Sequence, residues 1–254
     1  MKKIPCVLFL FFFVFRSVAL KVELNEFAHI EQVFGLQIDS ETLLPMNDLN
    51  IEFGYILYQT YIETNIENVV LEVENIRDFA FVYVDNIFQG TMSDENKKVG
   101  LLVKTGKHVL KLYVENIGRI TYGPEILDNS KGLFGDININ GEYLKDWKIT
   151  ELKIRNCSVS NLNYSVNSLN VPCFHKGSFS TNSTSDIYLD ISGWGMGEAW
   201  INGKYIGSFW EVEKLKSIRV PASILKKGHN EIVIFELKNN GQRYVKLSSQ
   251  PVFI

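Results

Sequence analysis

The feature that most constrains the fold is a series of short alternating apolar segments joined by two-residue turns. Three pairs of segments meet across Asp85-Asn86, Asn140-Gly141 and Asn202-Gly203. Type I′ hairpin turns need positive φ at both central positions, which Asn, Asp and Gly tolerate better than other residues. Long helical periodicity is nearly absent. The pattern therefore predicts an all-β sandwich or barrel assembled from hairpins.

The chain also contains an internal repeat. Phe88-Gln89-Gly90-Thr91 is matched by Tyr205-Ile206-Gly207-Ser208, and each stretch is followed by a Lys-Gly or Gly-Lys turn and an apolar strand. Two modules of about 115 residues fit the usual domain size. We predict a signal peptide over 1–19, a short N-terminal segment over 20–37, and β-sandwich domains over 38–150 and 151–254. Within 20–37, the spacing of Phe27, Ile30 and Val33 allows one short amphipathic helix.

The N-terminus has the three parts of a secretory signal. Lys2 and Lys3 precede the apolar run Val7–Phe15, and Ser17-Val18-Ala19 supplies small residues at a cleavage site. The run is shorter than the roughly 20 residues that span a bilayer. We expect removal of residues 1–19 and export, to the extracellular space or the lysosomal lumen. An uncleaved signal anchor is the alternative, and Arg16 argues against it.

Export implies oxidised cysteines and glycosylation. Cys157 and Cys173 remain after signal removal, and an even pair in an oxidising compartment predicts a disulfide. The alternative is two buried thiols. Sequons at Asn156, Asn163 and Asn182 predict N-glycans on the region between the domains and just beyond it.

Several kinds of chemistry are not indicated. The net charge of −3 shows no concentrated basic face for nucleic acid. The four histidines are scattered without metal-ligand spacing, and we expect neither a metal nor a cofactor. Asp186, Asp190 and Glu198 fall near predicted strand ends, where we expect solvated acids. The sequence contains neither a nucleophile elbow nor a phosphate-binding loop.

Four longer stretches, in this order along the chain, carry a specific resemblance. They are Phe53–Thr60, Val82–Gly90, Gly118–Gly123 and Gly193–Trp210. Together with their neighbours they resemble the two C-terminal β-domains of glycoside hydrolase family 35 β-galactosidases over residues 40–254. The resemblance implies two tandem jelly-roll-like sandwiches of the galactose-binding-like type.

In that family a (β/α)₈ barrel cleaves the sugar with two glutamates, one acting as acid/base and one as nucleophile. A barrel needs at least about 200 residues, and no stretch of this sequence resembles the family's catalytic glutamate motifs. We therefore assign no catalytic residue, and we do not expect hydrolysis by this chain alone.

Two groups of residues are candidates for sugar contact. The resemblance places the Gly118–Gly123 loop near the barrel's sugar pocket, so Tyr122 is a possible contact; alternatively, Arg119 and Tyr122 only tie the loop to its own domain. Trp194, Trp200 and Trp210 crowd one hairpin. Their rings can form a carbohydrate platform or can pack in the sandwich core, where large aromatic side chains are common.

Three functions remain open. The first is a secreted, non-catalytic β-domain protein that binds carbohydrate, such as a β-galactoside or glycan, or a protein partner through self-association or through a barrel-bearing relative. The second is a fragment of an active enzyme that hydrolyses terminal β-D-galactosyl residues. The third is a structural remnant without a ligand. We do not expect the chain to bind nucleic acid, and we do not expect it to bind a membrane after signal cleavage.

Overall fold

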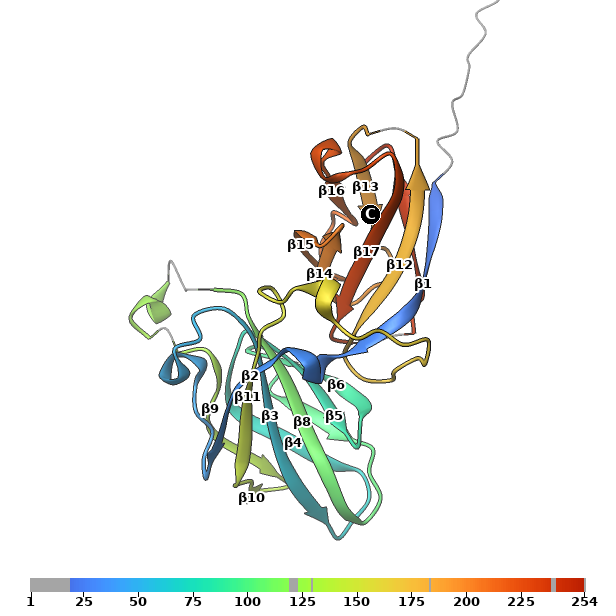
Figure 1. Ribbon diagram of the computed structural model, residues 1–254. Coiled ribbons are helices and arrows are strands. Elements are labelled where there is room, and N and C mark those ends of the chain that lie inside the picture. Colours follow the sequence, from blue (N-terminus) through green and yellow to red (C-terminus); the bar gives the residue numbers. More distant parts are fainter. Residues whose placement is uncertain (1–18, 119–122, 129, 183, 239–240, 254) are drawn as a thin grey trace, which may run out of the picture.

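The computed structural model describes residues 19–118, 123–128, 130–182, 184–238 and 241–253 (Figure 1). Residues 1–18 of the expected signal peptide lie outside this set. The all-β prediction is confirmed, because the described residues form three antiparallel sheets. Their helical segments are short 3-10 turns: η1 Ile30–Val33, η2 Met46–Leu49, η3 Pro124–Leu127, η4 Val159–Asn161 and η5 Ala222–Ile224. None of the described helices could cross a membrane.

The first module is a sandwich of a six-stranded and a four-stranded sheet. The six-stranded sheet has the order β2 (Phe34–Ser40), β11 (Trp147–Leu152), β3 (Gly54–Thr64), β8 (Gly106–Asn116), β5 (Phe79–Val84) and β6 (Ile87–Ser93). The four-stranded sheet has the order β10 (Glu142–Tyr143), β9 (Gly132–Ile139), β4 (Val69–Arg77) and β7 (Lys98–Leu101). Alternate apolar side chains of both sheets, such as Ile56, Leu71 and Leu112, are fully buried between them.

The second module is an eight-stranded sheet whose two halves face each other. Its order is β15 (Lys204–Trp210), β14 (Met196–Ile201), β17 (Gly228–Glu236), β12 (Cys173–Thr181), β1 (Leu20–His29), β18 (Tyr244–Ser248), β13 (Ile187–Asp190) and β16 (Ser217–Val220). Ile234 from one half and Leu189 from the other belong to the same buried cluster. Strands β15 and β16, the two ends of the sheet, lie near each other.

The three two-residue turns have the backbone that their sequences predict. Asp85 and Asn86 have φ of 50° and 65°, and Asn140 and Asn202 have φ of 50° and 52° before their glycines. Positive φ at both positions matches the twist of the flanking strands. Each turn closes a hairpin, namely β5–β6, β9–β10 and β14–β15.

The internal repeat corresponds to a repeated four-stranded unit. Strands β3, β8, β5 and β6 are paired in the same order as β12, β17, β14 and β15. Each hairpin has a bulge at the same place in the repeated motif, where the register skips Gln89 in one unit and Ile206 in the other. In both units the next residue is a glycine covered by a neighbouring strand's side chain, Val99 over Gly90 and Ile218 over Gly207.

The helix considered for residues 20–37 does not form. Residues Leu20–His29 are strand β1, which lies inside the eight-stranded sheet between β12 and β18. Val22 and Leu24 are buried while Lys21 and Glu23 are exposed, so a period of two was present in the sequence. Strand β1 therefore completes the sheet of the second module beside β12 (Figure 1), although in the sequence the whole first module separates β1 from the other strands of that sheet.

Candidate functional site

The two modules pack directly on each other through the outer face of the six-stranded sheet. Leu57 and Tyr113 of the first module share a buried cluster with Phe174 and Phe235 of the second. The hydroxyl of Tyr83 donates across the interface to the backbone oxygens of Leu237 (2.7 Å) and Lys238 (2.8 Å). Side-chain packing and hydrogen bonds to the backbone together fix the position of one module against the other.

A cleft of about 690 Å³ opens at this interface. The first module and the linker contribute Glu115 at the end of β8, Ile117 just beyond it, and Arg155. The second module contributes residues from β14, from β15 and β16 with the segment between them, and from the segment before β14: Ile191, Met196, Ser208, Phe209, Trp210, Glu213, Leu215, Ser217, Ile218 and Arg219. The walls combine apolar, aromatic and charged side chains, as ligand sites commonly do.

Trp210 is the aromatic residue of this cleft with the largest ring. It is partly buried, and its indole meets the edge of Phe79 with the ring centroids 5.2 Å apart. The contact fixes the indole while part of it remains accessible at the cleft. A held aromatic ring at the mouth of a cleft can stack on the apolar face of a sugar at low entropic cost.

A buried ionic network lies beside the cleft. The guanidinium of Arg155 donates from Nε to Oε1 of Glu198 (2.5 Å) and from Nη2 to Oε1 of Glu115 (3.3 Å). Glu198 also accepts from the hydroxyls of Tyr55 and Tyr205, each at 2.7 Å. Two carboxylates thus face one guanidinium, with Glu115 from the first module and Glu198 from the second.

The pKa of Glu115 is raised to about 7, first by burial and then by repulsion from Glu198. Only 3% of the residue is exposed, and its Oε2 atom has no hydrogen-bond partner. Desolvation disfavours the charged form of a carboxyl group, and a neighbouring carboxylate adds to that cost. The opposing effects on the pKa, from the hydroxyl of Tyr55 and then from the charge of Arg155, are smaller.

Sequence reasoning missed this network. Glu198 was expected to be solvated near a strand end, but none of it is exposed. Strand β14 lies inside the sheet between β15 and β17, and the Glu198 side chain contacts Tyr55 of the first module and Arg155. The sequence did contain a signal, because Glu198 is the one charged residue in the otherwise apolar stretch Met196–Ile201. In the structure every residue of that stretch is buried. A charge in such a run is retained only where it is paired.

Two of the three tryptophans proposed as sugar contacts are core residues. Trp194 is 1% exposed within the second module, and Trp200 is 2% exposed at the module interface. Their rings are covered by other side chains, so neither can stack on a ligand in this conformation. Trp210 alone of the three lines the cleft. Arg119 and Tyr122 lie outside the described residues.

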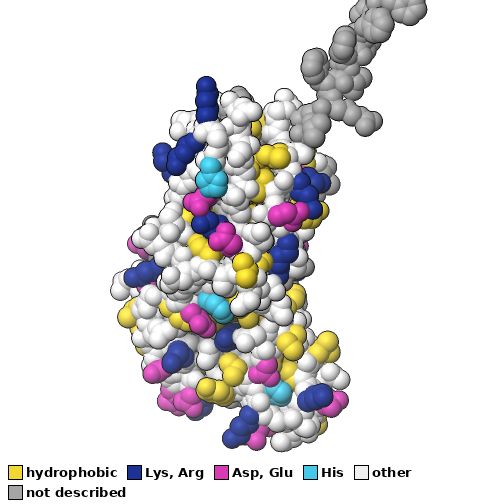
Figure 2. All heavy atoms as spheres, turned by 45° about the vertical axis from the view of Figure 1, so that its right-hand side comes forward, with side chains coloured by type: hydrophobic (Ala, Val, Ile, Leu, Met, Phe, Trp, Pro, Cys, Tyr) yellow, Lys and Arg dark blue, Asp and Glu magenta, His cyan; other side chains and the backbone are white. Residues whose placement is uncertain are grey.

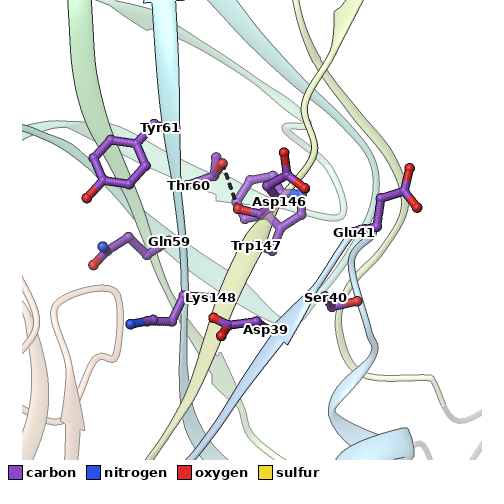
Figure 3. Close-up of a pocket in the computed structure, with 9 residues that line it drawn as sticks. All are labelled: Asp39, Ser40, Glu41, Gln59, Thr60, Tyr61, Asp146, Trp147 and Lys148. Atoms are coloured by element: carbon purple, nitrogen blue, oxygen red, sulfur yellow. Dashed lines mark hydrogen bonds between the residues drawn. The ribbon is translucent and has the colours of Figure 1, made fainter.

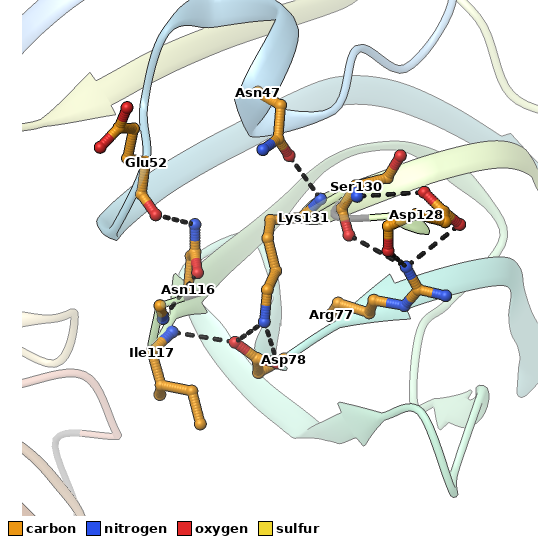
Figure 4. Close-up of polar contacts among 10 residues, drawn as sticks. Asn47, Glu52, Arg77, Asp78, Asn116, Ile117, Asp128, Ser130 and Lys131 are labelled. Atoms are coloured by element: carbon orange, nitrogen blue, oxygen red, sulfur yellow. Dashed lines mark hydrogen bonds and ion pairs between the residues drawn. The ribbon is translucent and has the colours of Figure 1, made fainter. Parts of the chain in front are cut away.

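The segment that carries Arg119 and Tyr122 is anchored at both ends by Asp78. Its carboxylate accepts from the backbone N–H of Ile117 (2.9 Å) and from Nζ of Lys131 (2.7 Å), as Figure 4 shows. Lys131 is almost fully buried. Arg77 adds hydrogen bonds to Asp128. These contacts fix Ile117 and Lys131, on either side of the segment, within the first module.

The expected disulfide is not formed between Cys157 and Cys173, both of which are described. The Sγ atom of Cys173 instead lies 3.4 Å from Nε2 of His175 within β12. Burial raises the pKa of the Cys173 thiol to about 12 and lowers that of His175 to about 3. Both groups are therefore neutral at physiological pH, so this pair cannot supply a reactive thiolate.

The three sequon asparagines are exposed. Asn156 and Asn163 lie on the linker between the modules, and Asn182 lies just after β12. The backbone nitrogen and oxygen of Asn163 are both bonded to the amide of Gln32 (2.7 and 3.0 Å), and the residue is exposed. N-glycosylation at these positions is sterically compatible with the fold.

A second, polar hollow of about 460 Å³ lies on the first module, away from the interface. Figure 3 shows Gln59, Tyr61 and Lys148 on one side of strands β3 and β11, and Asp146 and Glu41 on the other. Trp147 is buried beneath them, and Thr60 bonds the backbone oxygens of Lys145 and Asp146. Its polar groups do not converge on one point, so we do not assign a site there.

Charge is mixed over the surface. Figure 2 shows Lys, Arg, Asp and Glu side chains interspersed along one face of both modules. Among the described residues, no three His, Cys, Asp or Glu side chains are grouped so that they could hold a metal ion. The interface cleft is the place where an aromatic ring, buried acids and the two modules come together.

The fold defines a pair of β-sandwich modules that pack together and enclose a cleft. Residues 44–153 match the first all-β domain of β-galactosidase, and residues 172–230 match the β-galactosidase galactose-binding domain. The two matches together cover more than half of the chain. The chain thus belongs to the β-galactosidase family, as its sequence motifs indicated, and corresponds to the part without the catalytic barrel.

Individual relatives agree. The chain is 32% identical over 200 residues to β-galactosidase-1-like protein 2 of Homo sapiens, covering 76% of this chain and 31% of that protein. It is 29% identical over 255 residues to the β-galactosidase of Mus musculus, with 86% and 38% covered. The chain thus spans about a third of the length of these relatives. An α-L-rhamnosidase structure from Streptomyces avermitilis aligns at 11% identity over 91% of this chain and 29% of its own, with a TM-score of only 0.28.

Proposed function

We propose that this chain is a secreted, non-catalytic carbohydrate-binding protein, and that a galactose-containing glycan binds in the interface cleft. The observation that carries the proposal is the composition of the cleft wall. Most of its lining residues, from Ile191 to Arg219, fall within the segment that matches the galactose-binding domain. That segment supplies Trp210 as a stacking surface, and Ser208 and Arg219 as hydrogen-bonding groups.

Replacing the stacking ring tests the proposal. Trp210→Ala should weaken the binding of methyl β-D-galactopyranoside at least about tenfold, because a ring contact of about 1.4 kcal/mol is lost. Isothermal titration calorimetry measures the change, and Tyr143→Ala is the matched control, since Tyr143 is an exposed aromatic on β10 outside the cleft. Thermal unfolding of both variants verifies that the modules stay folded after the Phe79 contact is lost.

The wild-type protein is titrated with methyl β-D-galactopyranoside and with β-galactoside-terminated oligosaccharides. The carbohydrate proposal is refuted if neither gives a heat of binding at tens of millimolar sugar. Equal weakening by Trp210→Ala and Tyr143→Ala would place the sugar elsewhere on the surface. Tens of millimolar sugar is above the roughly millimolar dissociation constant of weak but specific binding, so specific binding would be detected.

A second candidate is that these modules act within a longer β-galactosidase that hydrolyses terminal galactosyl residues. The observation in its favour is that the chain spans about a third of its relatives' length. The mass of the native protein after glycan removal, detected with an antibody to the second module, separates the two. A mass near that of the present chain favours the binding protein, and an excess of about 200 residues or more favours the enzyme.

A further inference from the structure

Glu115 occupies an unusual position for a carboxylate. It is the last residue but one of β8, contributes to the cleft wall, and is buried where the two modules meet. One of its oxygens reaches Arg155 at 3.3 Å, while the other has no hydrogen-bond partner. A buried carboxylate with one oxygen unpaired is costly, and the cost disappears when the group binds a proton.

The charges around Glu115 do not balance its negative charge. Arg155, from the linker, is the cation in direct contact, and its shorter bond goes to Glu198 of β14. Tyr55 of β3 donates to Glu198 as well. Asp78, before β5, also repels Glu115, although Lys131 neutralises much of its charge at 2.7 Å. The network therefore carries one negative charge in excess when both glutamates are ionised.

We propose that Glu115 makes the cleft a proton-linked site, at which glycan binding and module packing are both coupled to protonation of its carboxyl group. The glycan part of this inference rests on the proposed function, whereas the packing part does not. A protonated Glu115 would leave Arg155 and Glu198 as a balanced ion pair across the interface. A ligand that displaces water from the cleft wall raises the cost of the charged form further.

The sign of the effect follows from the pKa of about 7 against an unfolded value of 4.5. A carboxyl group whose pKa is raised on folding is harder to ionise in the folded state than in the unfolded state. The folded state is therefore least stable at a pH where the group is ionised in both states. The folding equilibrium constant should thus fall as pH rises from about 4.5 to about 7, by on the order of 100-fold from this one residue, and should then level off. Glycan affinity should fall in the same direction, by about tenfold for each unit by which the ligand raises the pKa.

Glu115→Gln provides the decisive comparison, because the amide mimics the neutral acid. Guanidinium unfolding between pH 5 and pH 8.5 should show a smaller loss of stability with rising pH in Glu115→Gln than in wild type. The control is Glu63→Gln, an exposed glutamate on β3, which should retain the wild-type profile. His108, whose pKa is raised by Asp85, contributes in the same direction and is present in all three proteins.

Binding of methyl β-D-galactopyranoside at pH 6 and pH 8 completes the test. Wild type and Glu63→Gln should bind more tightly at pH 6, and Glu115→Gln should bind equally at both. Parallel unfolding profiles for wild type and Glu115→Gln would overturn the inference. Absence of sugar binding at either pH would refute the proposed function, while the unfolding profiles would still decide the role of Glu115.

A measurement on the unmodified protein covers the case in which Glu115→Gln does not fold. The ¹³C shift of the Glu115 side-chain carboxyl group, followed by NMR from pH 4 to pH 9, should titrate near neutrality. A midpoint in the ordinary range of exposed glutamates, near 4.3, would overturn the inference without any substitution.

Discussion

At the scale of single residues, the molecule concentrates its polar interactions where the modules meet. Tyr83, Tyr55 and Arg155 each reach from the first module or the linker to a group of the second. These contacts are formed between residues far apart in the chain, and Arg155 among them also lines the cleft. The residues that matter most for its chemistry are therefore also those that hold its two walls together.

Tyr83→Phe should destabilise the protein by about 1–2 kcal/mol, because the buried carbonyl of Leu237 and the partly buried carbonyl of Lys238 lose their donor. The residue is 1% exposed, and the phenylalanine ring keeps the packing against Tyr113 and Phe88. Guanidinium unfolding gives the change, with Tyr61→Phe as control, because Tyr61 is 74% exposed. An equal effect of both substitutions would mean that the interface bonds contribute nothing.

At the scale of elements, hairpins were predictable and long-range pairing was not. Asn140-Gly141 and Asn202-Gly203 specify their turns locally, so the sequence alone located β9–β10 and β14–β15. Strand β1 was not recognised, because its partners are more than a hundred residues away and its alternating segment is short. The network of Glu198 was missed for the same reason, since a sequence does not show what covers a strand.

Gly177→Ala should loosen the contact between β12 and β1. An added Cβ would collide with the backbone oxygen of Glu23 and with Leu24 in β1, at the point where the register shifts. We expect a loss of about 1–3 kcal/mol and faster amide exchange in β1. Gly100→Ala, on an exposed strand with open space around the site, is the control and should change neither quantity.

At the scale of the whole molecule, the sequence motifs gave the family and the two-module architecture. They did not reveal that the first module is inserted, in the sequence, between β1 and the other strands of the second module. Strands β1 and β12–β18 form one sheet. The site at the interface was equally hidden, because it exists only once the modules have packed. Of the candidate residues, Trp210 was found from sequence, while Glu115 and Arg155 required the structure.

Residues 151–254 should not fold by themselves, because the sheet lacks its central strand β1. Joining residues 20–29 after Ile254 through a Gly-Ser linker should restore folding, since β1 and β18 are antiparallel neighbours with Leu20 opposite Leu247. Cooperative thermal unfolding and dispersed NMR signals are the measurements. The joined protein carrying Leu24→Asp, which places a charge in the core, is the control that should remain unfolded.

The central position of β1 also sets an order of events during translation. Strand β1 leaves the ribosome before the first module, yet its neighbours β12 and β18 follow only after that whole module. The first module can fold while the chain is still growing, whereas β1 stays unpaired at least until β12 emerges, and its second edge stays unpaired until β18 emerges. Its alternating apolar residues are exposed during that interval, so biosynthesis of this protein depends on keeping the ten residues of β1 from aggregating.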